Sequence, residues 1–236
     1  MHEEVRTFCK HYIRGYDGTI RRVLDAGSFD MNGSTRVLFD RHVKYVGIDI
    51  HEGKGVDWVG MAHEYAAKGW DGELFDVLVS TECLEHDPHW EKTIRSCCQL
   101  VRPGGLVIMT CASDPRAPHA LELWPDGYYR NLEPADVLPV FRSVAVKGNA
   151  RKVRGGEDLQ FGGRREDALE CLDATGLEYE LREERSNGHL ADADGIVRII
   201  SLEAGGQRIS GRGPSATAAA DQVYFKLASM KLLGKV

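Results

Sequence analysis

Two aspartates near the start of the chain have the residue type and spacing to bind a nucleoside ligand. Asp25 ends a short apolar run and is followed two residues later by Gly27, and Asp49 ends the next apolar run. A glycine after a strand lets a ligand approach the backbone closely. An acid at the end of the second strand can accept both hydroxyl protons of a ribose. Asp25 also suits a cationic amine. We therefore predict a cofactor that carries both a ribose and an amine.

The loop that follows the first of these strands argues against a nicotinamide cofactor. From Gly27 to Gly33 it has the sequence Gly-Ser-Phe-Asp-Met-Asn-Gly. This lacks the G-x-G-x-x-G pattern of a dinucleotide-binding turn. The start of the next helix would instead favour a carboxylate or a phosphate. A nicotinamide oxidoreductase is therefore a minor alternative.

Alternating strands and helices must position these residues. Apolar runs predict strands at residues 22–25, 45–49, 56–59, 75–80, 106–111 and 141–146. Apolar residues at helical spacing predict helices at residues 3–14, 34–41, 88–101 and 134–139. Strands that are apolar on both faces and alternate with helices are typical of a parallel sheet covered on both sides. The predicted fold class is α/β, with a doubly wound, mostly parallel Rossmann-like sheet that binds ligands at its carboxyl edge.

The pattern changes after about residue 147. Glycine pairs at 155–156 and 162–163 punctuate a polar stretch that we interpret as a linker. Beyond it we expect a helix near 165–175, strands at 177–184, 195–202 and 207–210, and a final helix from Ser215. We therefore divide the chain into residues 1–149 and a small C-terminal α+β module at residues 150–236.

Four segments of the first domain occur in an order that is typical of one enzyme class. They are Val23-Leu24-Asp25-Ala26-Gly27-Ser28, the acid Asp49, the run from Ser80 to His86, and the run from Leu100 to Leu106. Over about residues 20–147 they resemble the class I S-adenosylmethionine-dependent methyltransferases. The resemblance implies S-adenosyl-L-methionine as cofactor and methyl transfer to an unidentified acceptor. Positioning the acceptor in line with the methyl group supplies much of the rate.

The resemblance also implies which residues bind the cofactor. The methionine end would lie against the first loop, and the ribose against the acid of the second strand. The adenine would lie against the segments after the second and third strands, and the sulfonium region against the end of the fourth. In that order the residues are Asp25, Ala26, Gly27, Ser28 and Gly33; Asp49; Ile50, Ala62 and His63; and Ser80 and Thr81.

Two regions are candidates for catalysis and acceptor binding. Glu82, with Glu85 and His86 nearby, forms either an acid/base cluster or a solvated helix start. The loop after the fifth strand carries a candidate base and aromatic residues, and such loops commonly line pockets. In one interpretation this loop stacks its aromatic side chains on a planar acceptor and holds an anionic group of it. In the other it is a surface loop that aromatic side chains anchor. We assign catalysis to His119 and Glu82, and substrate binding to Trp124, Tyr128, Tyr129 and Arg130.

A metal site has weaker support from the sequence. His86, Asp87 and His89 include a His-x-x-His spacing, but His89 follows a proline at a helix start and no further ligand is evident. A metal centre needs at least three protein ligands that converge. We therefore expect no metal.

Composition limits the partners and the compartment. A net charge of −6 gives no global field that attracts a phosphate backbone. No run approaches the ~18 apolar residues of a membrane span, and the first residues show no secretory signal. The six cysteines lack paired spacing, which indicates free thiols in a reducing cytoplasm. We expect a cytoplasmic enzyme with a small-molecule acceptor, no membrane partner and an undetermined oligomeric state.

The C-terminal module leaves a second class of function open. Its α-β-β-β-α order resembles HicA-like toxins and double-stranded-RNA-binding domains over about residues 164–233. Asn187-Gly188-His189 departs from the toxins' pattern, and Asn-Gly is also a common tight turn. Basic residues that could share one face are Arg208, Arg212, Lys226, Lys231 and Lys235. The alternative is a nucleic-acid-associated binding protein whose C-terminal module docks RNA or DNA.

Overall fold

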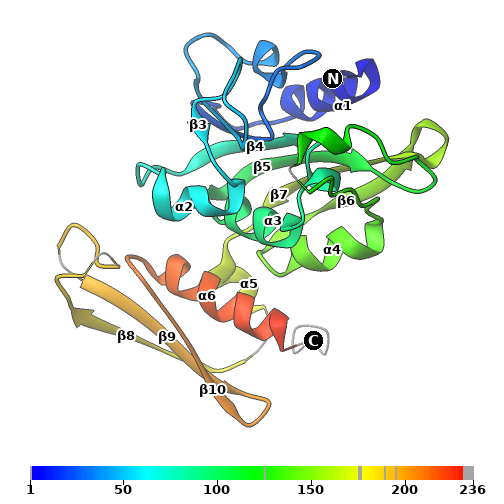
Figure 1. The fold of residues 1–236 in the computed structure, drawn as a ribbon. Coiled ribbons are helices and arrows are strands. Elements are labelled where there is room, and N and C mark those ends of the chain that lie inside the picture. The colour runs from blue at the N-terminus through cyan, green and yellow to red at the C-terminus, as the bar shows by residue number, and fades with distance from the viewer. Residues whose placement is uncertain (1, 125, 175–176, 189, 195, 231–236) are drawn as a thin grey trace. The chain divides into compact units, whose positions relative to one another are not determined.

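The computed structural model describes residues 2–124, 126–174, 177–188, 190–194 and 196–230. The chain forms two compact units, which we call the first and the second unit (Figure 1). The first comprises residues 1–141 and 146–165, and the second comprises residues 142–145 and 166–236. This division differs from the boundary that we expected at residue 149, because residues 146–165 contain two strands of the first unit's sheet.

A seven-stranded sheet forms the centre of the first unit. Its strands are β1 (Arg22–Ala26), β2 (Lys44–Asp49), β3 (Trp58–Val59), β4 (Phe75–Thr81), β5 (Val101–Ala112), β6 (Val146–Val153) and β7 (Asp158–Arg165). Their order is β3-β2-β1-β4-β5-β7-β6. The first five pair in parallel, and β7 is antiparallel to both of its neighbours. The predicted doubly wound, mostly parallel α/β sheet is confirmed.

Helices cover both faces of this sheet. They are α1 (Glu3–Arg14) on one face, and α2 (Tyr65–Lys68), α3 (Trp90–Gln99) and α4 (Pro134–Arg142) on the other (Figure 1). The buried Val5 and Phe8 of α1 pack with apolar side chains of β1, β4 and β5. In α3, the buried Trp90 and Ile94 are one helical turn apart, so the helix has one apolar stripe. These layers shield the central strands, which explains why their sequences are almost continuously apolar.

Three expectations about this unit were wrong. The helix expected at residues 34–41 is a 3-10 turn at Thr35–Leu38, and the strand expected at 141–146 is the end of α4 followed by β6. The polar stretch after residue 147 is not a linker, since most of it forms β6 and β7. In β7, position 162 has room only for glycine, because a Cβ there would lie 2.2 Å from the ring of Tyr12. Glycines that allow close packing therefore concealed a buried strand.

The two edges of the sheet differ in length and charge. At one edge, β3 pairs with β2 through only two residues. At the other edge, β6 exposes three cationic side chains, those of Lys147, Arg151 and Lys152. Both edges thus belong to strands that lack a long apolar surface.

The second unit has its own sheet and core. Its elements are α5 (Ala168–Asp173), β8 (Tyr179–Arg185), β9 (Ile196–Ala204), β10 (Gln207–Gly213) and α6 (Ala216–Ser229). The strands form an antiparallel sheet in the order β10-β9-β8. Leu172 of α5 and Val223 of α6 are buried against Ile200 and Ile209 of that sheet. A small C-terminal α+β module is therefore confirmed, while His189 lies outside the described residues.

The described helices include none that combines the length and the apolar character needed to cross a bilayer.

Candidate functional site

A cavity of about 460 Å³ opens at the carboxyl ends of β1, β2 and β4, and we call it the strand-end cavity. Asp25 and Asp49 both line it. They share it because β1 and β2 pair in parallel, so that their carboxyl ends meet at one edge. The segments after β4 and β5 complete its wall.

Asp25 is a buried carboxyl group with one free oxygen. Its Oδ2 accepts hydrogen bonds from the hydroxyls of Thr35, at 3.2 Å, and Tyr45. Its Oδ1 is also buried but has no hydrogen-bond partner among the described residues. Burial raises the pKa of Asp25 to about 6, although the two hydroxyls oppose the shift. The group can therefore change charge close to neutral pH, and Oδ1 is left for a ligand.

The loop after β1 places backbone rather than side chain against the cavity. Gly27 has φ +84°, and a Cβ there would lie 2.4 Å from the Cβ of Cys83. The N–H groups of Gly27 and Ser28 both donate to the carbonyl of Ile48, at 2.8 and 2.9 Å, which ties the loop to β2. Gly33, with φ +110°, donates its N–H to Oδ1 of Asp30 at 2.7 Å. Gly27, Ser28 and Gly33 all line the cavity, and Ala26 is the buried residue that ends β1.

Asp49 ends β2, and its carboxylate accepts hydrogen bonds from nearby backbone N–H groups. Its Oδ2 accepts from the N–H of Phe29 at 3.2 Å, and its Oδ1 accepts from the N–H of His51 at 2.9 Å. Oδ1 also lies 3.3 Å from Nδ1 of the His51 ring, whereas Oδ2 can accept a second hydrogen bond. Asp49 can therefore hold the first loop and still bind hydroxyl groups.

The remaining predicted cofactor residues fall into two groups. Ile50, Ala62 and Thr81 line the cavity. Ser80 and His63 are not among its lining residues. The hydroxyl of Ser80 donates to the carbonyl of Ala26 at 2.8 Å and so joins β4 to β1. The ring of His63 packs against that of His89, with centroids 4.9 Å apart. The structure thus gives these two residues packing contacts beside the cavity.

Glu82 lines the cavity but has polar partners of its own. Its backbone has φ +52°. Its Oε1 accepts from the hydroxyl of Thr110 at 3.0 Å, and its Oε2 pairs with Arg116 at 2.8 Å. Arg116 also pairs with the buried Asp158 of β7 at 2.7 Å. Both carboxylate oxygens of Glu82 are therefore already engaged by neighbouring side chains.

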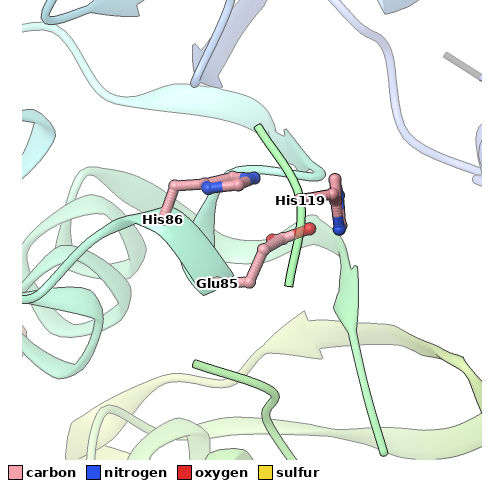
Figure 2. Close-up of side chains that lie close together, drawn as sticks. All are labelled: Glu85, His86 and His119. Carbon is pink, nitrogen blue, oxygen red and sulfur yellow. The ribbon is translucent and has the colours of Figure 1, made fainter. Parts of the chain in front are cut away.

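Glu85, His86 and His119 come together beside the cavity (Figure 2), which the two histidines line and Glu85 does not. Glu85 and His86 belong to the 3-10 turn Leu84–His86, and His119 belongs to the loop after β5. One potential ligand atom from each residue lies within 4.8 Å of the other two. Burial, followed by the charge of Glu82, raises the pKa of Glu85 to about 8. Burial, followed by His119, lowers the pKa of His86 to about 4. We name these three residues the Glu-His-His cluster.

The predicted substrate residues do not form one group. Trp124 lines the cavity, whereas Tyr128, Tyr129 and Arg130 are not among its lining residues. The ring of Tyr129 packs edge-on against the rings of His86 and His119, at 5.4 and 5.1 Å. Arg130 pairs with Asp136 at 2.9 Å. Tyr129 therefore supports the histidines, and Arg130 interacts with α4.

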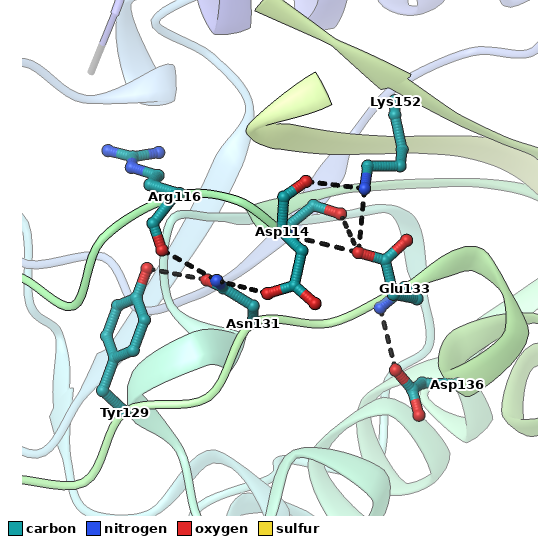
Figure 3. A network of polar contacts seen from close by, with 8 residues as sticks. Asp114, Arg116, Tyr129, Asn131, Glu133, Asp136 and Lys152 are labelled. Carbon is teal, nitrogen blue, oxygen red and sulfur yellow. Dashed lines mark hydrogen bonds and ion pairs between the residues drawn. The ribbon is translucent and has the colours of Figure 1, made fainter. Parts of the chain in front are cut away.

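A polar network holds the loop that carries Arg116 and His119 (Figure 3). The amide nitrogen of Asn131 donates to Oδ1 of Asp114 and to the carbonyl of Arg116, both at 2.8 Å. Glu133 accepts from the N–H of Asp114 at 3.0 Å and from Lys152 at 2.9 Å. The loop is thus fastened at its start, before it reaches the cavity.

Among the residues of this wall that sequence reasoning missed, Arg116 and Cys83 make the clearest contacts. Arg116 lines the cavity and links Glu82 to β7, and Cys83 lines it opposite Gly27. The only signal for Arg116 was a cation in the loop after the fifth strand. Its carboxylate partners lie far away in sequence, so no local pattern pointed to them.

Comparisons with known proteins agree with the fold. A family model described as "Methyltransferase domain" matches residues 1–152. The ubiquinone biosynthesis O-methyltransferase of Nitrosococcus oceani is 30% identical over 154 residues, which are 53% of this chain and 64% of that protein. The enzyme of the same name from Saccharophagus degradans is 30% identical over 111 residues, which are 42% and 46%. The chain thus spans about half to two thirds of the length of these curated relatives.

A solved structure shows the same architecture. It is the Burkholderia thailandensis 1,6-didemethyltoxoflavin-N1-methyltransferase with bound 1,6-didemethyltoxoflavin and S-adenosylhomocysteine. It has a TM-score of 0.52 and 19% identity, and the match covers 70% of this chain and 80% of that one. At this identity the likeness concerns the fold alone.

Proposed function

We propose that this chain, which belongs to the methyltransferase domain family, transfers a methyl group from S-adenosylmethionine to a hydroxyl oxygen of a small aromatic acceptor. The observation that carries the proposal is a single cavity lined by both Asp25 and Asp49 and, beside them, by His119 and Trp124. The first pair fits a nucleoside cofactor, and the second fits an aromatic hydroxyl compound. The curated relatives named above, which are O-methyltransferases, also support an oxygen acceptor.

The residues of the cavity fit S-adenosylmethionine. The buried Oδ1 of Asp25, which lacks a hydrogen-bond partner among the described residues, suits the ammonium group of the cofactor. Gly27 leaves room for close approach to the backbone. Asp49 keeps lone pairs for the ribose hydroxyls, and Ile50 offers an apolar surface to the adenine. When bound, the cofactor supplies an electrophilic methyl group, and this chain's residues hold it beside the acceptor.

His119 is the candidate proton acceptor on the other side of the cavity. Its Nδ1 lies 3.2 Å from the carbonyl of Ala117. A carbonyl only accepts hydrogen bonds, so Nδ1 donates and Nε2 keeps its lone pair. A nitrogen of this kind can accept the proton of a hydroxyl as the oxygen becomes methylated. Glu82 is less suited to the same role, because Arg116 and Thr110 already occupy its oxygens.

A methyl-transfer assay tests this proposal. The full chain is incubated with S-adenosylmethionine labelled in its methyl group and with matched phenol, catechol and aniline acceptors. We expect the label on the oxygen of the phenol or the catechol, because the cavity offers a base and an aromatic wall. Mass spectrometry of the products locates the label. Transfer to the aniline alone would contradict an oxygen acceptor.

The affinity for S-adenosylhomocysteine should depend on the charge of Asp25. Because burial raises its pKa to about 6, the carboxyl group is largely neutral at pH 5 and largely ionised at pH 7. Only the ionised form attracts the ligand's ammonium group, so affinity should rise as the pH increases through about 6. The gain approaches about tenfold per pH unit below the pKa if the neutral form binds poorly. Calorimetry across this range measures it, and Asp25→Asn should bind weakly with a flat profile. A wild-type profile equally flat would exclude this role for Asp25.

The nucleic-acid alternative gains no supporting contact from the described part of the second unit. Arg208 pairs with Glu180 at 3.5 Å, and Arg212 pairs with Glu184 at 3.0 Å. Lys226 donates to the carbonyl of Ser210. Lys231 and Lys235 lie outside the described residues. Cations that are paired with neighbouring acids offer little net charge to a phosphate backbone.

A further inference from the structure

We propose that the Glu-His-His cluster binds one divalent transition-metal ion of the zinc type at the wall of the strand-end cavity. Glu85 would supply a carboxylate oxygen, and His86 and His119 would each supply a ring nitrogen. The expectation of no metal arose from His86 and His89, but His89 packs against His63 instead. The third candidate ligand comes from a loop that is distant in sequence, which the spacing of residues did not show.

The distances within the cluster suit such an ion. One potential ligand atom from each residue lies within 4.8 Å of the other two. A point among three such atoms lies at most about 2.8 Å from each, and zinc bonds to nitrogen or oxygen are about 2.0–2.2 Å long. Side-chain movements of less than about 1 Å would therefore close the site. Figure 2 shows that the three side chains converge from two separate segments.

The burial of Glu85 is the second, independent observation. Its side chain is 0% exposed, yet neither carboxylate oxygen has a hydrogen-bond partner among the described residues. The nearby guanidinium of Arg116 pairs with Glu82 and Asp158. A buried carboxylate without a partner is costly unless a proton or a cation compensates it. An ion bound between Glu85 and the two histidines would satisfy its oxygens.

One of the two histidines, His119, is oriented as metal ligands commonly are. A ligand histidine usually donates its second ring N–H to a carbonyl, a carboxylate or water. In His119, Nδ1 lies 3.2 Å from the carbonyl of Ala117, so Nε2 is the nitrogen available to an ion. In His86, Nδ1 is buried and has no hydrogen-bond partner within the described part of the chain. The ring of Tyr129 packs against both imidazoles and restricts their rotation.

The set of ligands indicates the type of ion and its role. Two imidazoles and one carboxylate favour zinc or iron(II) over magnesium or calcium, which prefer oxygen ligands. Three protein ligands also leave a coordination position open, as in catalytic zinc sites. His86 and His119 line the cavity, so that position would be accessible to an acceptor. If the proposed O-methylation holds, the ion would lower the pKa of the acceptor hydroxyl so that its proton passes to water, and Nε2 of His119 would be a ligand rather than the base.

Cobalt(II) titration of the full chain, after metal removal with a chelator, tests the site without any acceptor. Visible absorption reports Co²⁺ bound to imidazole and carboxylate, and mass spectrometry counts Zn²⁺ retained after desalting. We expect one ion per chain and an affinity at least about tenfold lower in Glu85→Gln and in His119→Ala. His42→Ala, which alters an exposed histidine of the same unit, should bind as the wild type does. Circular dichroism verifies that each variant is folded.

Two results would overturn the proposal. One is Co²⁺ binding that is unchanged in both Glu85→Gln and His119→Ala, since the ion would then bind elsewhere. The other is a wild-type chain that binds S-adenosylhomocysteine but neither Co²⁺ nor Zn²⁺. Failure of ion binding would leave O-methylation intact. Failure to methylate hydroxyls would remove only the ion's proposed role in activating the acceptor.

Discussion

Gly27→Ala should both destabilise the first unit and abolish measurable binding of S-adenosylhomocysteine. Gly27 has φ +84°, which costs a residue with a side chain about 1–3 kcal/mol. The new Cβ would lie 2.4 Å from the Cβ of Cys83, an atom that moves only with its backbone. Such overpacking costs about 1–3 kcal/mol more. We therefore expect the free energy of unfolding to fall by about 2–6 kcal/mol, as measured by urea denaturation.

Gly72→Ala separates the effect of the clash from that of backbone strain. Gly72 has φ +90°, but a Cβ there meets nothing within 4 Å. This control should lose about 1–3 kcal/mol and bind the ligand normally. Adding Cys83→Gly to Gly27→Ala removes the colliding atom and should restore part of the loss. If the two single variants matched in both stability and binding, the proposed contact would be wrong.

Asp49→Ala should weaken S-adenosylhomocysteine binding by about 1.5–3 kcal/mol, or roughly 10- to 150-fold. The substitution removes a carboxylate proposed to accept hydrogen bonds from the ribose hydroxyls. It also frees the N–H groups of Phe29 and His51, which anchor the first loop. Calorimetry with the folded variant measures the change.

Glu52→Ala is the matched control for Asp49→Ala. Glu52 is an exposed acid three residues further along the same loop, and it is not a lining residue of the strand-end cavity. Its loss changes the net charge equally, so a general electrostatic effect would appear in both variants. Wild-type affinity in Asp49→Ala would remove that residue from the proposed ribose site.

The part of the fold that follows from local sequence was predictable. Strands β1, β4 and β5 contain apolar runs, because both of their faces are covered. Parallel pairing then places Asp25 and Asp49 at one edge, so their joint position in the cavity was foreseeable. By contrast, β7 contains Gly162 and Gly163 and polar residues, and its strand character depends on pairing with β5 and β6.

Side-chain direction was the less predictable part of the site. The types of Tyr128, Tyr129 and Arg130 suited an acceptor pocket, but their partners decided where they point. Arg130 has Asp136 within reach on α4 and pairs with it. His119 meets Glu85 and His86 because the network of Asn131 and Glu133 shapes its loop. Such convergence depends on tertiary contacts between segments that share no local pattern.

The edges of the sheet bear on how the chain avoids aggregation. An uncovered strand can recruit a strand from another copy and so begin a fibre. Here β3 is too short to template more than a brief pairing, and β6 carries Lys147 and Arg151 along its exposed length, whereas its Lys152 is paired with Glu133. A second copy docking there edge to edge would bring cations against cations. The short length of β3 at one edge, and repulsion between cationic β6 strands at the other, therefore disfavour pairing with a second copy.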